Sequence, residues 1–557
     1  MRRPGVLCLA LLFAFACAPP VVHDLVIRGG TIYDGRGGPG LVADVAIEDG
    51  KITAIGTLTA ARGRRELDVT GLAVAPGFIN MLSHSEDSLI EDPRSQSEIR
   101  QGVTLEVFGE GSAGPLNETM RKQWLEMQGD IRYDIPWTTL GQYLDHLERR
   151  GISPNVASFV GAATVREHVL GLENRPPTPA ELERMKVLVA QAMEEGALGL
   201  TTALIYTPAT FASTEELIEL AKVAARHGGI FSAHMRSEGD RLLEAIDEMV
   251  HIAREATIPV EIYHLKAAGR DNWSKLDAAI AKIDAARAAG LKVTADMYVY
   301  TAGATGFDAA MPPWVQEGGI KAWVERLKDP GNRARVLAEM RQPGKDWENL
   351  YLAAGAEGIL FLGFKTEALK PLIGKTLAEV AVARGKSPED TVVDLVVEDG
   401  TRVEVAYFLM SEDNIKKQIA LPWMSFNSDA GSTAPEGNFL KSSTHPRAYG
   451  NFARLLGKYV REEKVIPLGE AIRRLTTLPA EVLGLKDRGA IAPGYFADIA
   501  VFDPARITDH ATFEKPMQYA TGMVHVLVNG VPVLENGQHT GATPGRIVRG
   551  RGFKPGR

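Results

Sequence analysis

The chain has 557 residues, of which 45% are hydrophobic and 24% are charged, a balance typical of a globular protein. Its formal net charge of −8 argues against a nucleic-acid partner. Both cysteines, Cys8 and Cys17, lie in the first seventeen residues, so the rest of the chain offers no disulfide, cysteine nucleophile or thiolate metal site.

Residues 1–20 predict an export signal and a linker. Two arginines precede an apolar run from Val6 to Ala16, which is too short to span a bilayer as a mature helix. Small residues then lead to Cys17, in the pattern of a bacterial lipoprotein cleavage site that would lipidate this cysteine. Plain secretion after cleavage at Ala16 or Ala18 is the alternative. We expect an exported bacterial protein, periplasmic or membrane-anchored through this lipid alone.

Short strands near both ends of the chain predict a small β-sandwich. Alternating apolar and polar residues run from Asp24, and the same pattern returns from Met523 around an Asn-Gly turn. Nothing similar lies between them. We therefore expect residues 21–74 and 483–545 to form one β-sandwich, followed by a tail at residues 546–557.

The middle of the chain alternates apolar strands with helical stretches, which is the pattern of βα units. It predicts a (β/α)8 barrel of the α/β class over residues 75–482, with an inserted subdomain at about 305–400 before the eighth strand. Almost every strand runs into polar or glycine-rich residues at its C-terminal end, where such barrels build active sites. The expected strands are Ala73–Met81, Thr104–Phe108, Val156–Val160, Leu198–Thr202, Gly229–Ala233, Pro259–Tyr263, Lys292–Ala295 and Met424–Asn427.

Two histidines, His234 and His264, follow consecutive strands that are separated by one amphipathic helix, predicted over about 240–255. Both imidazoles should therefore lie at the C-terminal edge of the barrel, and neutral imidazole is a common zinc ligand. A single histidine there is usually structural. The pair, together with Asp429 after the eighth strand, predicts a metal centre. Asp429 could instead cap its Asn-Ser-Asp-Ala-Gly turn.

These residues make the chain resemble the D-aminoacylases, or N-acyl-D-amino-acid deacylases, of the amidohydrolase superfamily. The resemblance runs from about Asp24 to Pro504 and implies a metal-dependent hydrolase that cleaves N-acyl-D-amino acids to a carboxylate and a free D-amino acid. It rests on the order and spacing of Ala75–Asn80, Gln101–Thr104, Gly199–Tyr206, His234–Arg236, His264–Lys266, Asp296–Gly303, Asn427–Asp429, His445–Gly450 and Gly489–Asp503.

The resemblance implies a role for each residue of the predicted metal centre. His234 and His264 would bind a divalent metal, most simply Zn²⁺. The metal would lower the pKa of a bound water towards ~7 and polarise the amide carbonyl. Asp429 would take the water's proton and pass it to the leaving amine.

The chain departs from the family after the first strand, where relatives carry His-x-His. Here Leu82 and His84 occupy those positions, and leucine cannot bind a metal. His84 either binds metal or lines the pocket. The first metal position of the family is therefore impaired.

A second departure follows the second strand, where relatives carry a bridging cysteine in a Gly-Asn-Cys-Gly turn. This chain has Gly109-Glu-Gly-Ser, so Glu110 lies one residue from the cysteine position, between glycines that let the backbone turn it inward. His/His/Glu with an open water position is a catalytic zinc pattern. We expect about one zinc per chain, held by Glu110, His234 and His264, with a solvated turn glutamate as the alternative.

An N-acyl amino acid carries a carboxylate, so the pocket for this small-molecule substrate needs a cation. By register with the family, Lys266 matches the carboxylate-binding position, and Lys417 stands where relatives carry arginine. Tyr206 matches a tyrosine that orients the scissile carbonyl, and Tyr298 matches a further substrate contact. Three more side chains either line the site or support it through salt bridges: Arg236, His445 and Arg447.

Two rival functions remain at this stage. A cyclic-amide hydrolase or dipeptidase of the same superfamily generally needs two metals and an intact His-x-His, which Leu82 argues against. A non-catalytic binding protein on the same fold has no need for a metal base, which His234, His264 and Asp429 argue against. Oligomeric state has no signal in the sequence.

Overall fold

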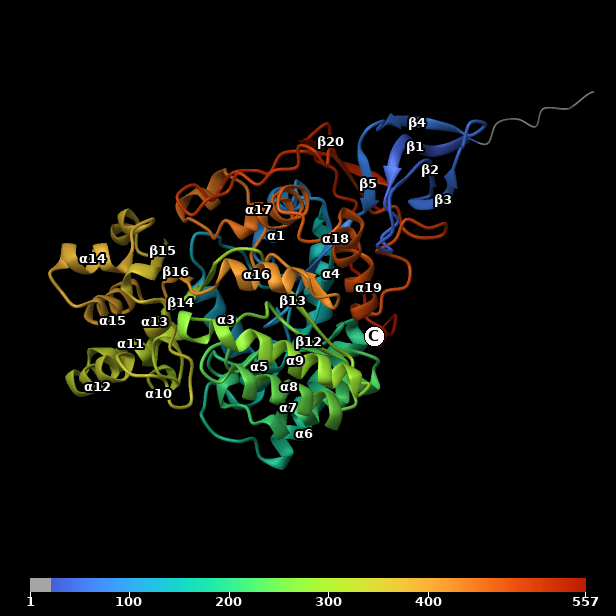
Figure 1. Cartoon of the computed structure of the whole chain (residues 1–557). Helices are drawn as coiled ribbons and strands as arrows, with labels where there is room; N and C mark the ends of the chain where they lie inside the picture. Colours follow the sequence, from blue (N-terminus) through green and yellow to red (C-terminus); the bar gives the residue numbers. More distant parts are fainter. Residues whose placement is uncertain (1–21, 557) are drawn as a thin grey trace, which may run out of the picture.

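The computed structural model describes residues 22–556, and the predicted export signal and linker at residues 1–20 lie outside them. A central barrel carries an inserted lobe on one side and a β-sheet built from both ends of the chain on the other (Figure 1). Within the described residues, every helix is too short or too polar to cross a membrane.

Eight parallel strands form the barrel, as the sequence predicts. Strands β8 and β9 act as one strand interrupted at Phe159, and a parallel bridge from Ser83 to Ala430 joins the first strand to the residues after the last. The barrel strands are β6 (Phe78–Ser83), β7 (Val103–Phe108), β8 (Asn155–Ser158), β9 (Val160–Gly161), β10 (Gly199–Ala203), β11 (Ile230–His234), β12 (Val260–Ile262), β13 (Val293–Met297) and β17 (Met424–Phe426).

Helices cover the outside of the barrel, and their ends follow from the sequence. In α6, Thr178 and Glu181 form a capping box, Pro179 occupies the first turn, and Gly196 ends the helix in the left-handed conformation. The helices of this layer and of the loops above it are α1 (Ser88–Glu91), α2 (Gln96–Ile99), α3 (Glu118–Met127), α4 (Leu140–Arg150), α5 (Ala162–Leu170), α6 (Pro179–Glu195), α7 (Thr214–Arg226), α8 (Leu242–Glu255), α9 (Leu276–Ala288), α16 (Glu412–Ile419), α17 (Arg447–Arg454), α18 (Leu468–Leu475) and α19 (Thr477–Leu483).

The expected first strand, Ala73–Met81, is in fact two strands. Strand β5 (Ala73–Pro76) pairs with strands of the terminal sheet, and only β6 belongs to the barrel. The break falls at Gly77, where a Cβ atom would lie 2.1 Å from Thr104 Oγ1, so only glycine allows this close approach of the two segments. The apolar run is continuous although the chain passes from one sheet to the other, so the sequence pattern does not reveal the break.

Both ends of the chain build one nine-stranded sheet, in the order β21-β20-β19-β18-β5-β1-β2-β3, with β4 paired to β1. Its apolar residues, such as Ile27, Val45 and Ile499, pack together in a core of their own. The strands are β1 (Val22–Ile32), β2 (Leu41–Glu48), β3 (Lys51–Gly56), β4 (Arg62–Asp68), β18 (Ile499–Phe502), β19 (Met523–Val528), β20 (Val531–Glu535) and β21 (Gln538–His539).

The inserted lobe lies between β13 and β17 and forms the separate body at the left of Figure 1. A three-stranded antiparallel sheet, β14-β16-β15, begins and ends it, so the insertion runs from about Ala302 to Phe408 rather than over 305–400. It has its own hydrophobic core. Its elements are β14 (Ala302–Gly306), α10 (Pro313–Gln316), α11 (Ile320–Lys328), α12 (Pro330–Met340), α13 (Leu350–Ala354), β15 (Ile359–Gly363), α14 (Leu377–Arg384), α15 (Pro388–Asp399) and β16 (Glu404–Phe408).

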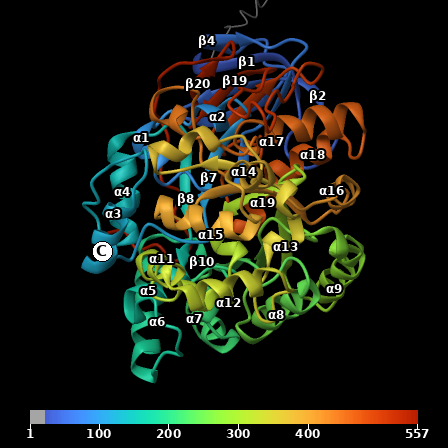
Figure 2. The same cartoon turned by 90° about the vertical axis from the view of Figure 1, so that its left-hand side faces the viewer.

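The C-terminal residues, predicted as a tail, pack against the barrel. Val548 donates its backbone N–H to Val156 (2.7 Å), and Gly550 donates to Gly196 (2.9 Å). The C-terminus therefore ends beside the barrel helices, away from the terminal sheet (Figures 1 and 2).

Candidate metal centre

His234 and His264 meet at the C-terminal edge of the barrel. His234 is the last residue of β11, and His264 follows β12, its parallel neighbour. Their ring centroids are 4.6 Å apart, and both side chains are buried. The strand–helix–strand register predicted from the sequence therefore places two imidazoles side by side.

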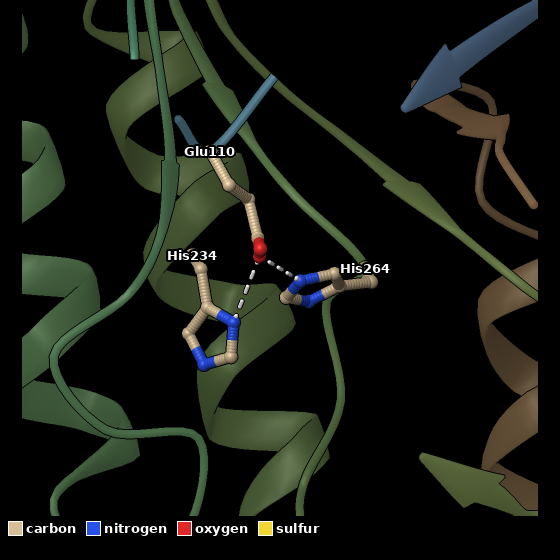
Figure 3. Close-up of side chains that lie close together, drawn as sticks. All are labelled: Glu110, His234 and His264. Atoms are coloured by element: carbon tan, nitrogen blue, oxygen red, sulfur yellow. Dashed lines mark hydrogen bonds and ion pairs between the residues drawn. The ribbon is translucent and has the colours of Figure 1, made fainter. Parts of the chain in front are cut away.

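Glu110 points between these two rings (Figure 3). Its Oε1 lies 3.1 Å from His234 Nδ1 and 3.0 Å from His264 Nε2. It follows β7, has a left-handed backbone (φ +62), and donates its N–H to Thr201 Oγ1 (3.0 Å). Burial raises the pKa of Glu110, but the hydrogen bonds and charges of the two histidines outweigh it and hold the pKa well below its usual range.

The three side chains fit a zinc ion. Their ligand atoms lie within 4.8 Å of one another, and two imidazole nitrogens with one carboxylate oxygen form a donor set that zinc accepts. The second ring nitrogen of His264, Nδ1, lies 2.9 Å from Glu238 Oε1, which turns Nε2 towards Glu110. A carboxylate behind a ligand histidine is the usual way to fix its orientation.

Asp429 and His84 lie on the other side of Glu110. His84 Nε2 is 3.1 Å from Asp429 Oδ1 and 3.7 Å from Glu110 Oε2, so these three side chains form a second group able to hold a metal. Leu82 is fully buried and turns into the core. His84, left open by the sequence, therefore belongs to the site.

Arg447 pairs with Asp429 through Nη1 and Oδ2 at 2.7 Å, and both side chains are buried. Burial raises the pKa of Asp429, but Arg447, His264 and His84 together hold it far below its usual range. Asp429 is therefore ionised at neutral pH.

The basic side of the cavity is formed by Lys266, Tyr298 and Arg447. Lys266 Nζ lies 5.6 Å from the centre of the Tyr298 ring, and the Arg447 guanidinium lies 4.4 Å from it. Lys266 also pairs with Glu238 at 2.6 Å. Tyr206 lines the same cavity and shares a hydrogen bond of 2.6 Å with Thr305. The cavity has a volume of about 360 Å³.

Comparison with known proteins identifies the family. A profile of the amidohydrolase family matches residues 65–345 and 440–534. The D-aminoacylase of Alcaligenes xylosoxydans xylosoxydans is 34% identical over 530 residues, which cover 94% of this chain and 97% of the relative. This chain belongs to the D-aminoacylase family of amidohydrolases.

Further members of the family support the assignment. The N-acyl-D-glutamate deacylase of the same organism is 33% identical, over 94% of this chain and 96% of the relative. A crystal structure of D-aminoacylase gives a TM-score of 0.77 at 34% identity, covering 94% of this chain and 99% of that one. The N-acyl-D-glutamate deacylase of Bordetella bronchiseptica, complexed with zinc and a phosphonate inhibitor, gives 0.78 at 30% identity, covering 95% and 99%.

The structure does not bring Lys417, one of the predicted substrate contacts, to the cavity. Lys417 lies on α16, is half exposed and pairs with Asp277 at 2.5 Å, away from the cavity. Helix α16 turns Ile415, Gln418 and Ile419 towards the barrel, so Lys417 must face outward. Arg447, eighteen residues after Asp429, supplies the second cation of the cavity.

Two functional candidates were not selected from the sequence. Glu238 lies four residues after His234 in an irregular loop, where no periodicity marks its direction. Arg402 lines the cavity from the inserted lobe, with its guanidinium 4.9 Å from the Tyr206 ring centre. Arg236, for which the sequence allows either a place in the site or a supporting salt bridge, pairs with Glu248 at 2.9 Å and does not line the cavity.

Proposed function

We propose that this chain hydrolyses the amide bond of N-acyl-D-amino acids, releasing a carboxylate and a free D-amino acid. The observation that carries the proposal is the meeting, in one cavity, of a zinc-type ligand set, an ionised aspartate and two cations. An N-acyl amino acid presents the matching features, because its amide bond lies beside a carboxylate. Relatives at 31–34% identity over almost the whole chain are deacylases of such compounds.

Glu110, His234 and His264 would hold the zinc ion. When bound, zinc supplies a Lewis acid that polarises the amide carbonyl and lowers the pKa of water. Glu238 holds the imidazole of His264 in the orientation that this ligand set requires.

Asp429 performs the proton transfers in this proposal. As the water oxygen bonds to the carbonyl carbon, one carboxylate oxygen accepts the water's proton, and it returns the proton to the nitrogen as the C–N bond breaks. Arg447 keeps this carboxylate ionised and fixes its orientation. Tyr206, which lines the same cavity, would orient the scissile carbonyl.

The substrate carboxylate would bind between Lys266 and Arg447. Both cations lie near the ring of Tyr298, and all three side chains line the cavity of the zinc ligands. Arginine can offer two parallel donors to a carboxylate, whereas lysine acts as a point charge. This arrangement recognises a carboxylate on the carbon next to the amide nitrogen.

A paired substrate panel tests the proposed function. The purified protein is incubated with the N-acetyl derivatives of D- and L-methionine and D- and L-leucine, and the released amine is measured. We expect release from the D compounds and little from their L partners. Hydrolysis of dihydropyrimidines or dipeptides, with no release from either N-acyl series, would overturn the proposal.

We further propose that the protein is exported and anchored by a lipid on Cys17. The proposal is supported by the arginines, the apolar run and the small residues that precede this cysteine. Cell fractionation of the full chain and of its Cys17→Ser variant tests it. A variant that stays in the membrane fraction as the parent does would contradict the anchor.

A further inference from the structure

A second and larger cavity opens from the metal centre. Its volume is about 860 Å³, against about 360 Å³ for the cavity that holds Lys266 and Arg447. We call the larger one the aromatic cavity. The two cavities share four lining residues, so they adjoin at the metal centre. The shared residues are His84, Glu110, Tyr206 and Arg402.

Residues of α3 and of the inserted lobe, two parts that lie close together in Figure 1, both line the aromatic cavity. Ion pairs hold the two parts together, from Lys321 to Glu126 at 2.6 Å and from Lys370 to Asp130 at 2.9 Å. The cavity is therefore built jointly by the barrel loops and the insertion.

Its wall is rich in large apolar side chains. Trp124, Tyr133 and Trp137 line one side, and the last two rings stack at 6.2 Å with an interplanar angle of 14°. Met127 is 55% exposed and Trp124 is partly exposed, although both are costly to leave in water. An apolar hollow with a few polar groups, beside a reactive centre, is typical of a ligand pocket.

The position of the cavity decides which part of the substrate enters it. Lys266, Tyr298 and Arg447 line the smaller cavity and not the aromatic one. A substrate whose carboxylate binds there, and whose scissile carbonyl lies at Glu110, directs its acyl group towards His84 and beyond. Given the proposed deacylase function, on which this inference rests, we propose that the aromatic cavity binds a large, uncharged acyl group, aromatic or aliphatic.

The charges of the aromatic cavity argue against an anionic acyl group. Glu86, Asp87 and Glu167 all line it, and burial raises the pKa of Glu167 to about 7. Acidic side chains outnumber the cations among its lining residues, because the cations are Arg402, which pairs with Asp308 at 3.2 Å, and Lys321, which pairs with Glu126. A second carboxylate on the acyl chain would therefore enter a wall of acidic side chains, where the raised pKa of Glu86 and Glu167 shows that negative charge is already disfavoured.

A series of acyl groups on one D-amino acid tests the inference. We expect kcat/KM for N-octanoyl- and N-phenylacetyl-D-methionine to exceed that for N-acetyl-D-methionine by about tenfold or more, since several more carbons are buried. N-Succinyl-D-methionine should be the poorest substrate. A preference for the acetyl compound, in an enzyme that hydrolyses the whole series, would overturn this inference and leave the deacylase function standing. No hydrolysis of any member would overturn both.

Variants of the wall locate the acyl group. Trp124→Ala should lower kcat/KM for the octanoyl compound by about tenfold and leave the acetyl compound within about twofold. Met127→Asp, at a largely exposed position, should act in the same direction without a risk to folding. Trp314→Ala, in the inserted lobe and outside the cavity, is the matched control. If Trp124→Ala changed the preference among N-acetyl-D-amino acids of different side chains, and not among acyl groups, the cavity would hold the side chain and the inference would fail.

Discussion

Glu110 holds its carboxylate between two imidazoles by adopting a backbone conformation that is costly for a residue with a Cβ atom. Its φ of +62 lies in the left-handed region, and the N–H bond to Thr201 fixes the turn. His264 and Asp429, at φ +34 and +47, share this feature. Three side chains of the metal centre are therefore directed inward by left-handed backbone conformations after the ends of strands.

At the residue scale, the role of Asp429 predicts a loss of turnover without a loss of metal. Asp429→Asn keeps the shape of the side chain but removes its ability to accept a proton. We expect kcat to fall by about 10²–10⁴-fold, while the zinc content and the melting temperature change little. Steady-state kinetics with elemental analysis checks this. A variant with unchanged kcat would show that another group carries the proton.

The two lysines predicted from the sequence should now behave differently. Lys266→Ala should raise KM for N-acyl amino acids by about tenfold or more, the effect of one hydrogen bond to a charged group. It should affect amides that lack a carboxylate far less. Lys417→Ala is the matched control and should leave KM unchanged, because that side chain pairs with Asp277 at the surface. Equal effects of Lys266→Ala on both kinds of amide would contradict carboxylate binding.

At the scale of elements, the barrel strands could be predicted because each is an apolar run that ends at polar residues. The strand pattern placed His234 and His264 at the ends of neighbouring strands, and the glycines on either side of Glu110 indicated a turn there. Loops have no comparable sequence pattern that predicts where a side chain points. Glu238 lies in an irregular segment. Lys417 was assigned by its spacing from Asp429, but it lies on α16, whose buried face turns the lysine outward. The split of the first strand at Gly77 depended on partners far away in sequence.

The inserted lobe is anchored to the barrel through Glu348, which predicts a pH effect on stability. Its Oε1 accepts the N–H of Glu238 at 3.0 Å, and burial together with the charge of Glu238 raises the pKa of Glu348 to about 8. The unfolded chain has a pKa near ~4.3 for this group. The contribution of Glu348 to the free energy of unfolding is therefore fully present below about pH 4.3, and it is lost as the pH rises through about 8.

Glu348→Gln keeps the hydrogen-bond acceptor but cannot ionise. We expect the melting temperature of the parent to fall more between about pH 5 and pH 9 than that of the variant. Thermal unfolding at several pH values measures this difference. Glu367→Gln, an exposed carboxyl of the same lobe, is the control and should follow the parent. If the melting temperatures of all three proteins fell equally with pH, ionisation of Glu348 would not affect stability and this prediction would fail.

At the scale of the whole molecule, a buried polar cluster joins the terminal sheet to the barrel. Asp498 pairs with Arg488, accepts the N–H of Asn529 at 2.7 Å, and lies 3.3 Å from Asn155 Nδ2 of barrel strand β8. Both charged side chains are buried. The cluster fixes the sheet on the barrel, so its loss should weaken the fold far from the metal centre.

Asp498→Ala leaves Arg488 buried and unpaired. The free energy of unfolding should fall by about 3–5 kcal/mol, as for other broken buried ion pairs. Lys321→Ala, which breaks an exposed pair, should cost no more than about 1 kcal/mol. Denaturant unfolding measures both. A loss below about 1 kcal/mol for Asp498→Ala would show that the cluster does not hold the two parts together.

The most direct test of the central claim is the zinc content per chain of the purified parent and of its Glu110→Ala variant, with Lys417→Ala as control. We predict about one zinc per chain in the parent and the control. The Glu110→Ala variant should lose most of its zinc and its amide hydrolysis together, because two histidines alone leave the ligand set incomplete. Full zinc content and full activity in Glu110→Ala would contradict the assignment of Glu110 to the metal centre.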